Sequence, residues 1–151
     1  LTASAAASLK KLPNVKSVVL FEDQNVGYTF PNDITHFPWT ADNFGPIRIP
    51  KKGDQVQLND STIELYRRLI EGYEHQKITT QNGQYFINGK STSTYTIQEN
   101  YYWMMGDNRH RSQDSRYWGF VPETHIVGRA ALIWFSYSQS IRWNRLFNLI
   151  K

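Results

Sequence analysis

Two Asn-Gly dipeptides, six residues apart, restrict the fold of this chain more than any other local feature. They stand at Asn82-Gly83 and Asn88-Gly89, between short runs rich in β-branched and aromatic residues. Asn and Gly both tolerate the positive φ angles of a two-residue hairpin turn, so each pair predicts a tight reversal between antiparallel strands. The sequence therefore predicts three consecutive strands, at residues 77–81, 84–87 and 90–98.

Two helices are predicted before this hairpin region. Residues 2–11 are rich in alanine and end in two lysines, which suits a short helix with cations at its C-terminus. Ser61 and Glu64 form a capping box, which predicts a second helix that ends near Gly72. The expected apolar faces are Leu1, Ala5, Leu9 and Leu12 in the first helix, and Ile63, Tyr66, Leu69, Ile70 and Tyr73 in the second.

Apolar runs predict further strands. Residues 17–21 indicate a buried strand, residues 47–50 and 56–58 indicate two strands around a Pro-Gly turn, and residues 25–45 a long loop. The chain is therefore expected to be mainly β, with one or two short helices. The tail, residues 141–151, mixes apolar and basic side chains and is expected either to lie on a membrane interface or to dock on the core.

The composition limits the classes of function. With 151 residues the chain is about one domain long, and it has no cysteine for a disulfide, a thiolate metal site or a nucleophile. The net charge of +4 comes from basic residues spread along the chain, which favours contact with an anionic membrane surface over nucleic acid. No run reaches the roughly 18 consecutive apolar residues of a membrane span, so any anchor is expected outside this chain.

The most concentrated chemistry lies in a polar run, residues 106–116, which we expect to form a loop between two buried strands at 101–105 and 126–135. Four hypotheses follow from its residue types. His110, Ser112 and Asp114 are the residue types of a Ser-His-Asp triad, but a triad is assembled from separate elements. Asp107, Asn108, Ser112 and Asp114 are oxygen donors suited to Ca²⁺, but the spacing is not that of an EF-hand and the neighbouring arginines would repel the ion.

The other two hypotheses concern the three arginines of the run. Arg109, Arg111 and Arg116 are the residue type that binds a phosphate, but they alternate with aspartates, which favours internal ion pairs. In the fourth hypothesis the run is a structural loop whose charged residues pair and whose short polar side chains bond the backbone. Composition alone favours this last interpretation.

The order of the residues adds a resemblance. The motif Gly-Asp-Asn-Arg-x-x-Ser-x-Asp-Ser-Arg spans positions 106–116, and Trp-Gly-Phe-Val-Pro and Ile-Val-Gly-Arg follow at positions 118–122 and 126–129. This block closely resembles the last motif block of type I signal peptidases (bacterial leader peptidases). These are membrane-anchored serine endopeptidases that remove signal peptides from exported proteins.

The resemblance implies a fold and a mechanism. The fold would be a partial β-barrel of antiparallel sheets, and the mechanism a Ser/Lys dyad in which a neutral lysine takes the proton of the attacking serine. Ser112 would orient that lysine, and the Asp114–Arg116 ion pair would stiffen the loop. Gly106, Asp107, Asn108 and Arg109 would support the same site, with no metal or cofactor.

The dyad itself has no counterpart in this chain. The Ser-x-Met-x-Pro motif of the family's nucleophile is absent, and so is the Gly-x-Pro-Gly-Asp motif that follows its base. Residues 50–54 resemble a third motif, Pro-x-x-Gly-Asp, but polar residues alternate after it, so neither Lys51 nor Lys52 is assigned as the base.

We therefore expect the C-terminal portion of a signal peptidase. Residues 1–92 would be an accessory segment with helices and hairpins, and residues 93–151 would be the last part of the catalytic β domain. Anchor, nucleophile and base would precede Leu1. The expected partners are preproteins with small residues before the cleavage site, and the expected location is the outer face of the bacterial cytoplasmic membrane.

Two other hypotheses remain open. One is a non-catalytic β module that binds a peptide, a glycan or a protein through an aromatic surface. Its tryptophans would be Trp39, Trp103, Trp118, Trp134 and Trp143. The other is a Ser/Lys peptidase relative that processes one dedicated substrate.

Overall fold

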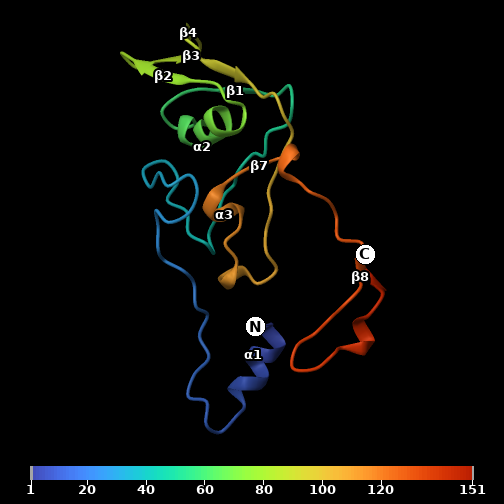
Figure 1. The fold of residues 1–151 in the computed structure, drawn as a ribbon. Coiled ribbons are helices and arrows are strands. Elements are labelled where there is room, and N and C mark those ends of the chain that lie inside the picture. The colour runs from blue at the N-terminus through green and yellow to red at the C-terminus, as the bar shows by residue number, and fades with distance from the viewer. Residues whose placement is uncertain (1, 151) are drawn as a thin grey trace.

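The structure is a computed structural model that describes residues 2–150, and it contains several small antiparallel sheets joined by long irregular segments (Figure 1). The paired strands are β1 (Gln55–Gln57) with β5 (Thr94–Thr96), β2 (Ile78–Gln81) with β3 (Gln84–Ile87) and β3 with β4 (Lys90–Ser91), β6 (Tyr101–Tyr102) with β7 (Val121–Pro122), and β8 (Leu132–Ile133) with β9 (Asn148–Leu149). The α-helices are α1 (Ala3–Lys10), α2 (Ile63–Arg68) and α3 (Ser115–Trp118). The expected antiparallel sheets and short helices are confirmed, although the sheets of the described residues stay separate and do not form a barrel.

Both predicted Asn-Gly hairpins are present. Asn82 and Asn88 have φ angles of 51°, and the glycines that follow have φ angles of 74° and 81°, as a two-residue hairpin turn requires. The strand predicted at residues 90–98 is divided in two, because β4 pairs with β3 whereas β5 crosses over to pair with β1. This crossover joins the hairpin to the segment that precedes α2.

The predicted helix at residues 63–72 is confirmed, but its cap differs from the expected one. Asn59 Oδ1 accepts hydrogen bonds from the backbone N–H groups of Ser61 and Thr62, both at 3.0 Å, so an Asn-based turn replaces the capping box. After Arg68 the helix continues as the π-helical turn η1 (Leu69–Tyr73). This turn ends at Tyr73, which agrees with the predicted end near Gly72.

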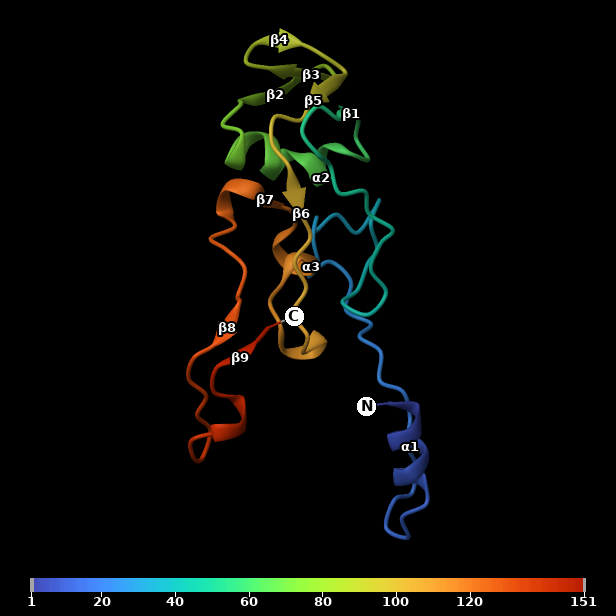
Figure 2. The ribbon, with the colours of Figure 1, turned by 90° about the vertical axis from the view of Figure 1, so that its right-hand side faces the viewer.

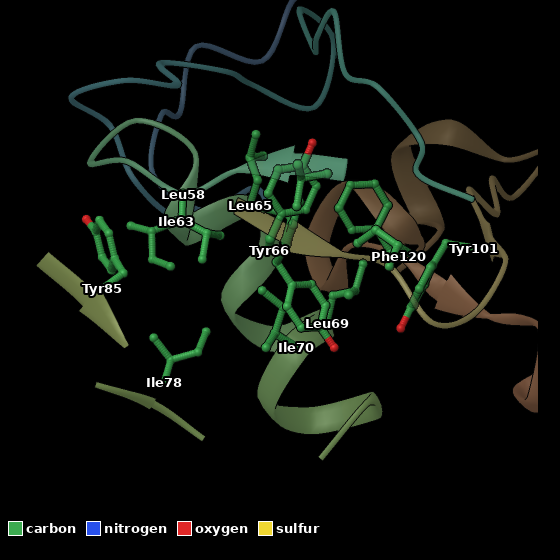
Figure 3. Packing of buried hydrophobic residues seen from close by; sticks show 14 residues of the cluster. Leu58, Ile63, Leu65, Tyr66, Leu69, Ile70, Ile78, Tyr85, Tyr101 and Phe120 are labelled. Carbon is green, nitrogen blue, oxygen red and sulfur yellow. The ribbon is translucent and has the colours of Figure 1, made fainter. Parts of the chain in front are cut away.

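The hydrophobic core lies on both sides of α2, as Figure 3 shows. Leu69 and Ile70 are at most 1% exposed, and the hairpin residues Ile78 and Tyr85 cover one side of the helix. On the other side Phe120 stacks on Tyr66 with 6.2 Å between ring centroids. The core thus combines residues from both sides of position 92, and the division into two segments at that position stays a prediction.

Several predicted strands are wrong. Residues 17–21 form no strand, and Val19, Leu20 and Phe21 are 76 to 84% exposed. Of the run 126–135 only Leu132 and Ile133 lie in a strand, and of the run 101–105 only Tyr101 and Tyr102. Residues 47–50 form no strand. The physical reason is that β-propensity stabilises a strand only where a partner strand and a surface to pack on are present.

The two ends of the chain lie away from the core. Helix α1 forms as predicted, with Thr2 as its N-cap, but none of its residues is buried. Leu9 and Leu12 of the expected apolar face are exposed, and Leu1 lies outside the described residues. The tail pairs with β8 and not with the core. Among residues 2–150, no helix has the length and apolar character needed to cross a bilayer.

Figures 1 and 2 show the two ends as separate arms. We call residues 2–23 the N-terminal arm and residues 127–150 the C-terminal arm. Both extend beyond the core in the same direction as the loop 106–116, and the three-stranded hairpin sheet lies at the opposite end of the molecule (Figure 2).

Candidate functional site

The polar loop is closed at its base by two hydrogen bonds between Met104 and Ser115, one between backbone groups and one to the Ser115 hydroxyl. Ser115 N–H donates to the Met104 carbonyl at 3.0 Å, and Met104 N–H donates to Ser115 Oγ at 2.9 Å. Ser115 is fully buried and begins α3, which returns the chain toward β7. Because both ends of the loop are joined here, residues 106–114 form a closed unit that protrudes from the core.

An ion pair between Asp114 and Arg116 forms the centre of the loop. Arg116 Nε donates to Asp114 Oδ1 at 2.9 Å and Arg116 Nη2 donates to Asp114 Oδ2 at 3.0 Å, so the pairing is bidentate. Asp114 is only 5% exposed and Arg116 only 2% exposed. Two planar groups joined by parallel hydrogen bonds fix each other's orientation as well as their charge.

Backbone donors add to the stabilisation of the Asp114 carboxylate. Burial by itself would raise the pKa of Asp114, but hydrogen bonds from the Arg116 guanidinium, from Gly106 N–H and from Arg116 N–H outweigh burial and hold the pKa below its usual value. In the other direction, the hydrogen bond to Asp114 raises the pKa of Arg116. Both groups are therefore charged at neutral pH.

Arg116 also connects the loop to a distant segment. Its Nη1 donates to the Ala41 carbonyl at 3.0 Å, and its Nη2 donates to the Arg109 carbonyl. The Arg116 carbonyl accepts from Phe30 N–H at 2.7 Å. Through its guanidinium and its backbone carbonyl, Arg116 thus joins the loop to residues 41 and 30, which are far away in sequence.

Ser112 lies directly over Gly106. A Cβ atom at Gly106 would come within 2.1 Å of Ser112 Oγ, so only glycine leaves room for this hydroxyl. Ser112 Oγ donates to the Asn108 carbonyl at 2.7 Å, while Gly106 N–H donates to Asp114 Oδ2 at 3.1 Å. Ser112 is only partly exposed, and its position is fixed from two sides.

The structure therefore brings together five of the seven predicted site residues: Gly106, Asn108, Ser112, Asp114 and Arg116. The side chains of Asp107 and Arg109 are exposed and make no hydrogen bond to other described residues. Both residues contribute through the backbone instead. Arg109 N–H donates to the Asp107 carbonyl at 3.1 Å, and the Arg109 carbonyl accepts from Arg116.

The geometry decides among the four hypotheses drawn from composition. Ser112 donates to a backbone carbonyl and not to His110, whose Nε2 instead lies 3.5 Å from Asp42, so these residues form no triad. Both oxygens of Asp114 are occupied by Arg116 and by backbone donors, which leaves none free for Ca²⁺. Arg116 is buried in its ion pair, so it does not join Arg109 and Arg111 around a phosphate.

Sequence reasoning missed the contribution of residues 29–41. Phe30 lies against Gly119, where a Cβ atom would come within 2.5 Å of the Phe30 ring and where φ is +86°. Its ring also contacts Trp103 and Phe120, with centroids 6.1 and 5.5 Å away. The only sequence clue was the glycine after Trp118, which marks a position where another part of the chain approaches closely.

Comparison with known proteins identifies the same stretch. A family model described as "Signal peptidase, peptidase S26" matches residues 45–135. The chain is 43% identical over 112 residues to "Signal peptidase I" of Haemophilus influenzae, which covers 70% of this chain and 29% of the relative. It is 33% identical over 108 residues to "Signal peptidase I" of Buchnera aphidicola from Acyrthosiphon pisum, covering 63% of this chain and 34% of the relative.

A shorter match falls on a third protein. The chain is 55% identical over 42 residues to "Signal peptidase I" of Aquifex aeolicus, covering 28% of this chain. The chain spans about a third of the length of the first two relatives. The family match begins at residue 45, so it includes half of the segment that was predicted to be accessory.

Proposed function

The chain belongs to the S26 signal peptidase family of serine endopeptidases, and on this premise we propose that it is the C-terminal portion of a type I signal peptidase. In this proposal the loop 106–116 supports a Ser/Lys dyad supplied by another part of the enzyme. The observation that carries the proposal is the position of Ser112, held over Gly106 beside the buried Asp114–Arg116 pair, inside the matched region.

The hydrogen bonding of Ser112 suits the proposed role. Its hydroxyl proton is directed to the Asn108 carbonyl, so the lone pairs of Oγ are left to accept a hydrogen bond. A neutral lysine amine has N–H donors and one lone pair. If one N–H donates to the fixed Ser112 Oγ, the lone pair is oriented toward the nucleophilic serine, whose proton it takes. Ser112 is thus a positioning residue and not the nucleophile.

The rest of the loop holds this acceptor in place. The Asp114–Arg116 pair closes the loop, Gly106 leaves space for Ser112, and Asn108 supplies the carbonyl that fixes the hydroxyl. A displacement of about 1 Å in such a support can cost about 100-fold in rate. Asp107 and Arg109, whose side chains are exposed, are proposed to contact the part of the enzyme that carries the dyad.

The proposal extends to the fold and the partners. The sheets β1–β5 and β6–β7 are proposed to be parts of a β-barrel that strands of the rest of the enzyme complete. The substrates are proposed to be preproteins with small residues before the cleavage site, cut at the outer face of the cytoplasmic membrane. The membrane surface is the second proposed partner, and the aromatic, basic tail at residues 141–151 is its contact.

The aromatic-module alternative receives less support. Trp39, Phe44 and Trp103 pack together, with neighbouring ring centroids 4.6 and 5.3 Å apart, next to the core. Trp134 and Trp143 lie on the C-terminal arm instead. The five tryptophans therefore do not form one surface.

The test is the variant Ser112→Ala in the complete enzyme, with steady-state cleavage of a signal-peptide substrate as the measurement. We expect kcat to fall by about 100-fold with KM nearly unchanged, and the pH–rate profile to shift, because the lysine loses its fixed acceptor. Ser138→Ala, at an exposed serine of the C-terminal arm, is the matched control. An unchanged kcat and pH profile in Ser112→Ala would contradict the proposed role.

A further inference from the structure

Glu74 is a buried carboxylate that the proposed mechanism does not use. It follows the turn η1 and is 8% exposed. Among residues 2–150, no lysine, arginine or histidine forms an ion pair with it. Its hydrogen bonds come instead from the Tyr95 hydroxyl, from the Tyr101 hydroxyl at 3.0 Å and from Gln98 N–H at 2.9 Å. Because hydrogen bonds are directional, a carboxylate held in this way fixes the position of the groups that donate to it.

The three donors all belong to the segment that leads into the loop 106–116. One lies in β5, one lies in β6, and the third lies between these strands. The Tyr101 ring also packs on Phe120, with 6.3 Å between ring centroids (Figure 3), but apolar contact has no preferred direction and lets a strand slide. Hydrogen bonds require a definite distance and angle. Glu74 therefore determines where the segment 95–101 lies relative to the helix α2.

The position of β6 in turn determines the position of Ser112. Met104, shortly after β6, makes the two hydrogen bonds with Ser115 that close the loop. Gly106 lies under Ser112 Oγ, where a Cβ atom would come within 2.1 Å of that oxygen. The stretch from Tyr101 to Gly106 is short, and planar peptide bonds and fixed bond lengths leave it few dihedral angles that could absorb a shift. A displacement of Tyr101 would therefore reach Ser112.

From this route, and resting on the proposed function, we propose that Glu74 is a positioning residue for signal-peptide cleavage. Its carboxylate holds the segment 95–101 so that Ser112 Oγ stays within hydrogen-bond distance of the base lysine. In this role Glu74 acts only through Ser112. The role predicts an effect on kcat and on the pH dependence of the reaction, and not on stability alone.

The test is the variant Glu74→Gln in the complete enzyme, with steady-state cleavage of a signal-peptide substrate as the measurement. Glutamine keeps the size of the side chain but replaces one acceptor oxygen by an NH₂ donor, so one tyrosine hydroxyl loses its acceptor. We expect kcat to fall about tenfold with KM changed by less than about twofold, because a misplaced support slows the chemical step and not substrate binding. The pH–rate profile should shift in the same direction as in Ser112→Ala. An unchanged kcat would overturn the inference.

Glu71→Gln is the matched control, because Glu71 lies on the same turn and receives the same substitution. The Glu71 carboxylate accepts from Ile78 N–H in β2 at 3.2 Å, so it holds the hairpin and not the segment 95–101. Both variants are assayed at a temperature at which denaturation curves show them fully folded. Only Glu74→Gln is expected to lower kcat. An equal loss in both variants would assign the effect to general destabilisation and would contradict the positioning role.

Tyr101→Phe is a second variant that does not depend on the folding of Glu74→Gln. It removes one hydroxyl donor and leaves the Glu74 carboxylate with the other two. We expect kcat to fall by about three- to tenfold, in keeping with the loss of one hydrogen bond that aligns β6. If kcat and the pH–rate profile of Tyr101→Phe equal those of the unchanged enzyme, the inference is wrong.

A double-mutant cycle with Ser112→Ala distinguishes positioning from a purely structural role. If Glu74 acts through Ser112, adding Glu74→Gln to Ser112→Ala should lower kcat by less than about twofold more, because no hydroxyl is left to position. A further loss of about tenfold would show an independent effect and would refute the route through Ser112.

Ser112→Ala by itself tests the proposed function. An unchanged kcat in Ser112→Ala refutes that function and the inference with it. A reduced kcat in Ser112→Ala together with an unchanged kcat in Glu74→Gln refutes the inference alone.

Discussion

The Asp114 carboxylate makes the stability of the folded chain depend on pH. Its pKa in the folded chain is held below the usual value, whereas in the unfolded chain it is about 3.9. The stability that it contributes is therefore fully present above about pH 4 and is lost as the pH falls through the lower folded pKa.

This gives a prediction for Asp114→Asn. Replacing the carboxylate leaves Arg116 buried with a weakened partner, so the free energy of unfolding at pH 7 should fall by about 3 kcal/mol. The loss of stability between about pH 5 and pH 2 should also become shallower, because the titrating group is gone. Urea denaturation at a series of pH values measures both. Asp107→Asn, at an exposed aspartate, should change the free energy of unfolding by no more than about 0.5 kcal/mol.

A second prediction concerns the glycine under Ser112. Gly106→Ala places a Cβ atom where Ser112 Oγ lies, so the loop must open or Ser112 must move. We expect a loss of about 1–3 kcal/mol in the free energy of unfolding, together with reduced cleavage by the complete enzyme. Gly128→Ala is the matched control, because a Cβ there meets nothing within 4 Å. Equal melting temperatures for the two variants would show that Ser112 is not held as described.

At the scale of elements, the π-helical turn η1 positions a buried carboxylate. Glu74 N–H bonds the Leu69 carbonyl at 3.0 Å and ends the turn, so the Glu74 side chain lies beneath β5 and β6. It accepts hydrogen bonds from the Tyr95 hydroxyl, from the Tyr101 hydroxyl at 3.0 Å and from Gln98 N–H at 2.9 Å. Tyr101 begins the stretch that leads to Met104, whose backbone holds Ser115, so this cluster supports the base of the loop.

The cluster predicts a sensitivity to alkaline pH. Burial, together with the Glu74 carboxylate, raises the pKa of Tyr95 and of Tyr101 above their usual value of about 10. Their contribution to stability is fully present below about pH 10 and is lost above it, because the unfolded tyrosines ionise first. The free energy of unfolding should therefore fall as the pH rises beyond 10, as guanidinium denaturation would show.

Single substitutions distinguish the contribution of Tyr95 and Tyr101 to stability from the general destabilisation that high pH causes. Tyr95→Phe or Tyr101→Phe should cost about 1–3 kcal/mol at pH 7, because each leaves Glu74 with one donor fewer. Each should also flatten the alkaline loss of stability. Tyr137→Phe, at an exposed tyrosine of the C-terminal arm, should do neither.

At the scale of the whole molecule, the chain has the supports of a catalytic site without the dyad itself. We predict that residues 1–151 alone do not cleave a peptide whose signal ends in Ala-x-Ala, because neither dyad motif is present. Mass spectrometry of the incubated peptide measures this, with the complete enzyme as the positive control. Specific cleavage by the isolated chain would contradict the proposal.

The parts of the fold that the sequence predicted well are those decided by local chemistry. The Asn-Gly turns require positive φ angles wherever they occur, and the α2 helix follows from its own apolar spacing. The Asp114–Arg116 pair is also present as the resemblance to the family implied, and the alternation of arginines with aspartates had already favoured internal ion pairs. The capping box failed because Asn59, an equally short polar residue nearby, supplied the competing hydrogen bonds.

The predictions that were wrong concern segments whose structure depends on a partner elsewhere in the chain. Val19 and Val127 belong to runs with the composition of buried strands, yet each is exposed because no strand lies opposite. The closure of the core by Phe30 over Gly119 likewise depends on a contact between positions far apart in sequence. A single sequence gives the preference of a segment but not its partner.

The tip of the β2–β3 turn has a practical use. At Gly83 an added Cβ would meet nothing within 4 Å, and Figure 1 places this hairpin at the end of the molecule opposite the loop. A fluorescent reporter or an affinity tag inserted between Asn82 and Gly83 would therefore extend into solvent, since exposed hairpin tips tolerate insertions. Because the chain contains no cysteine, one engineered there would also be a unique attachment point for a probe of the arms and the loop.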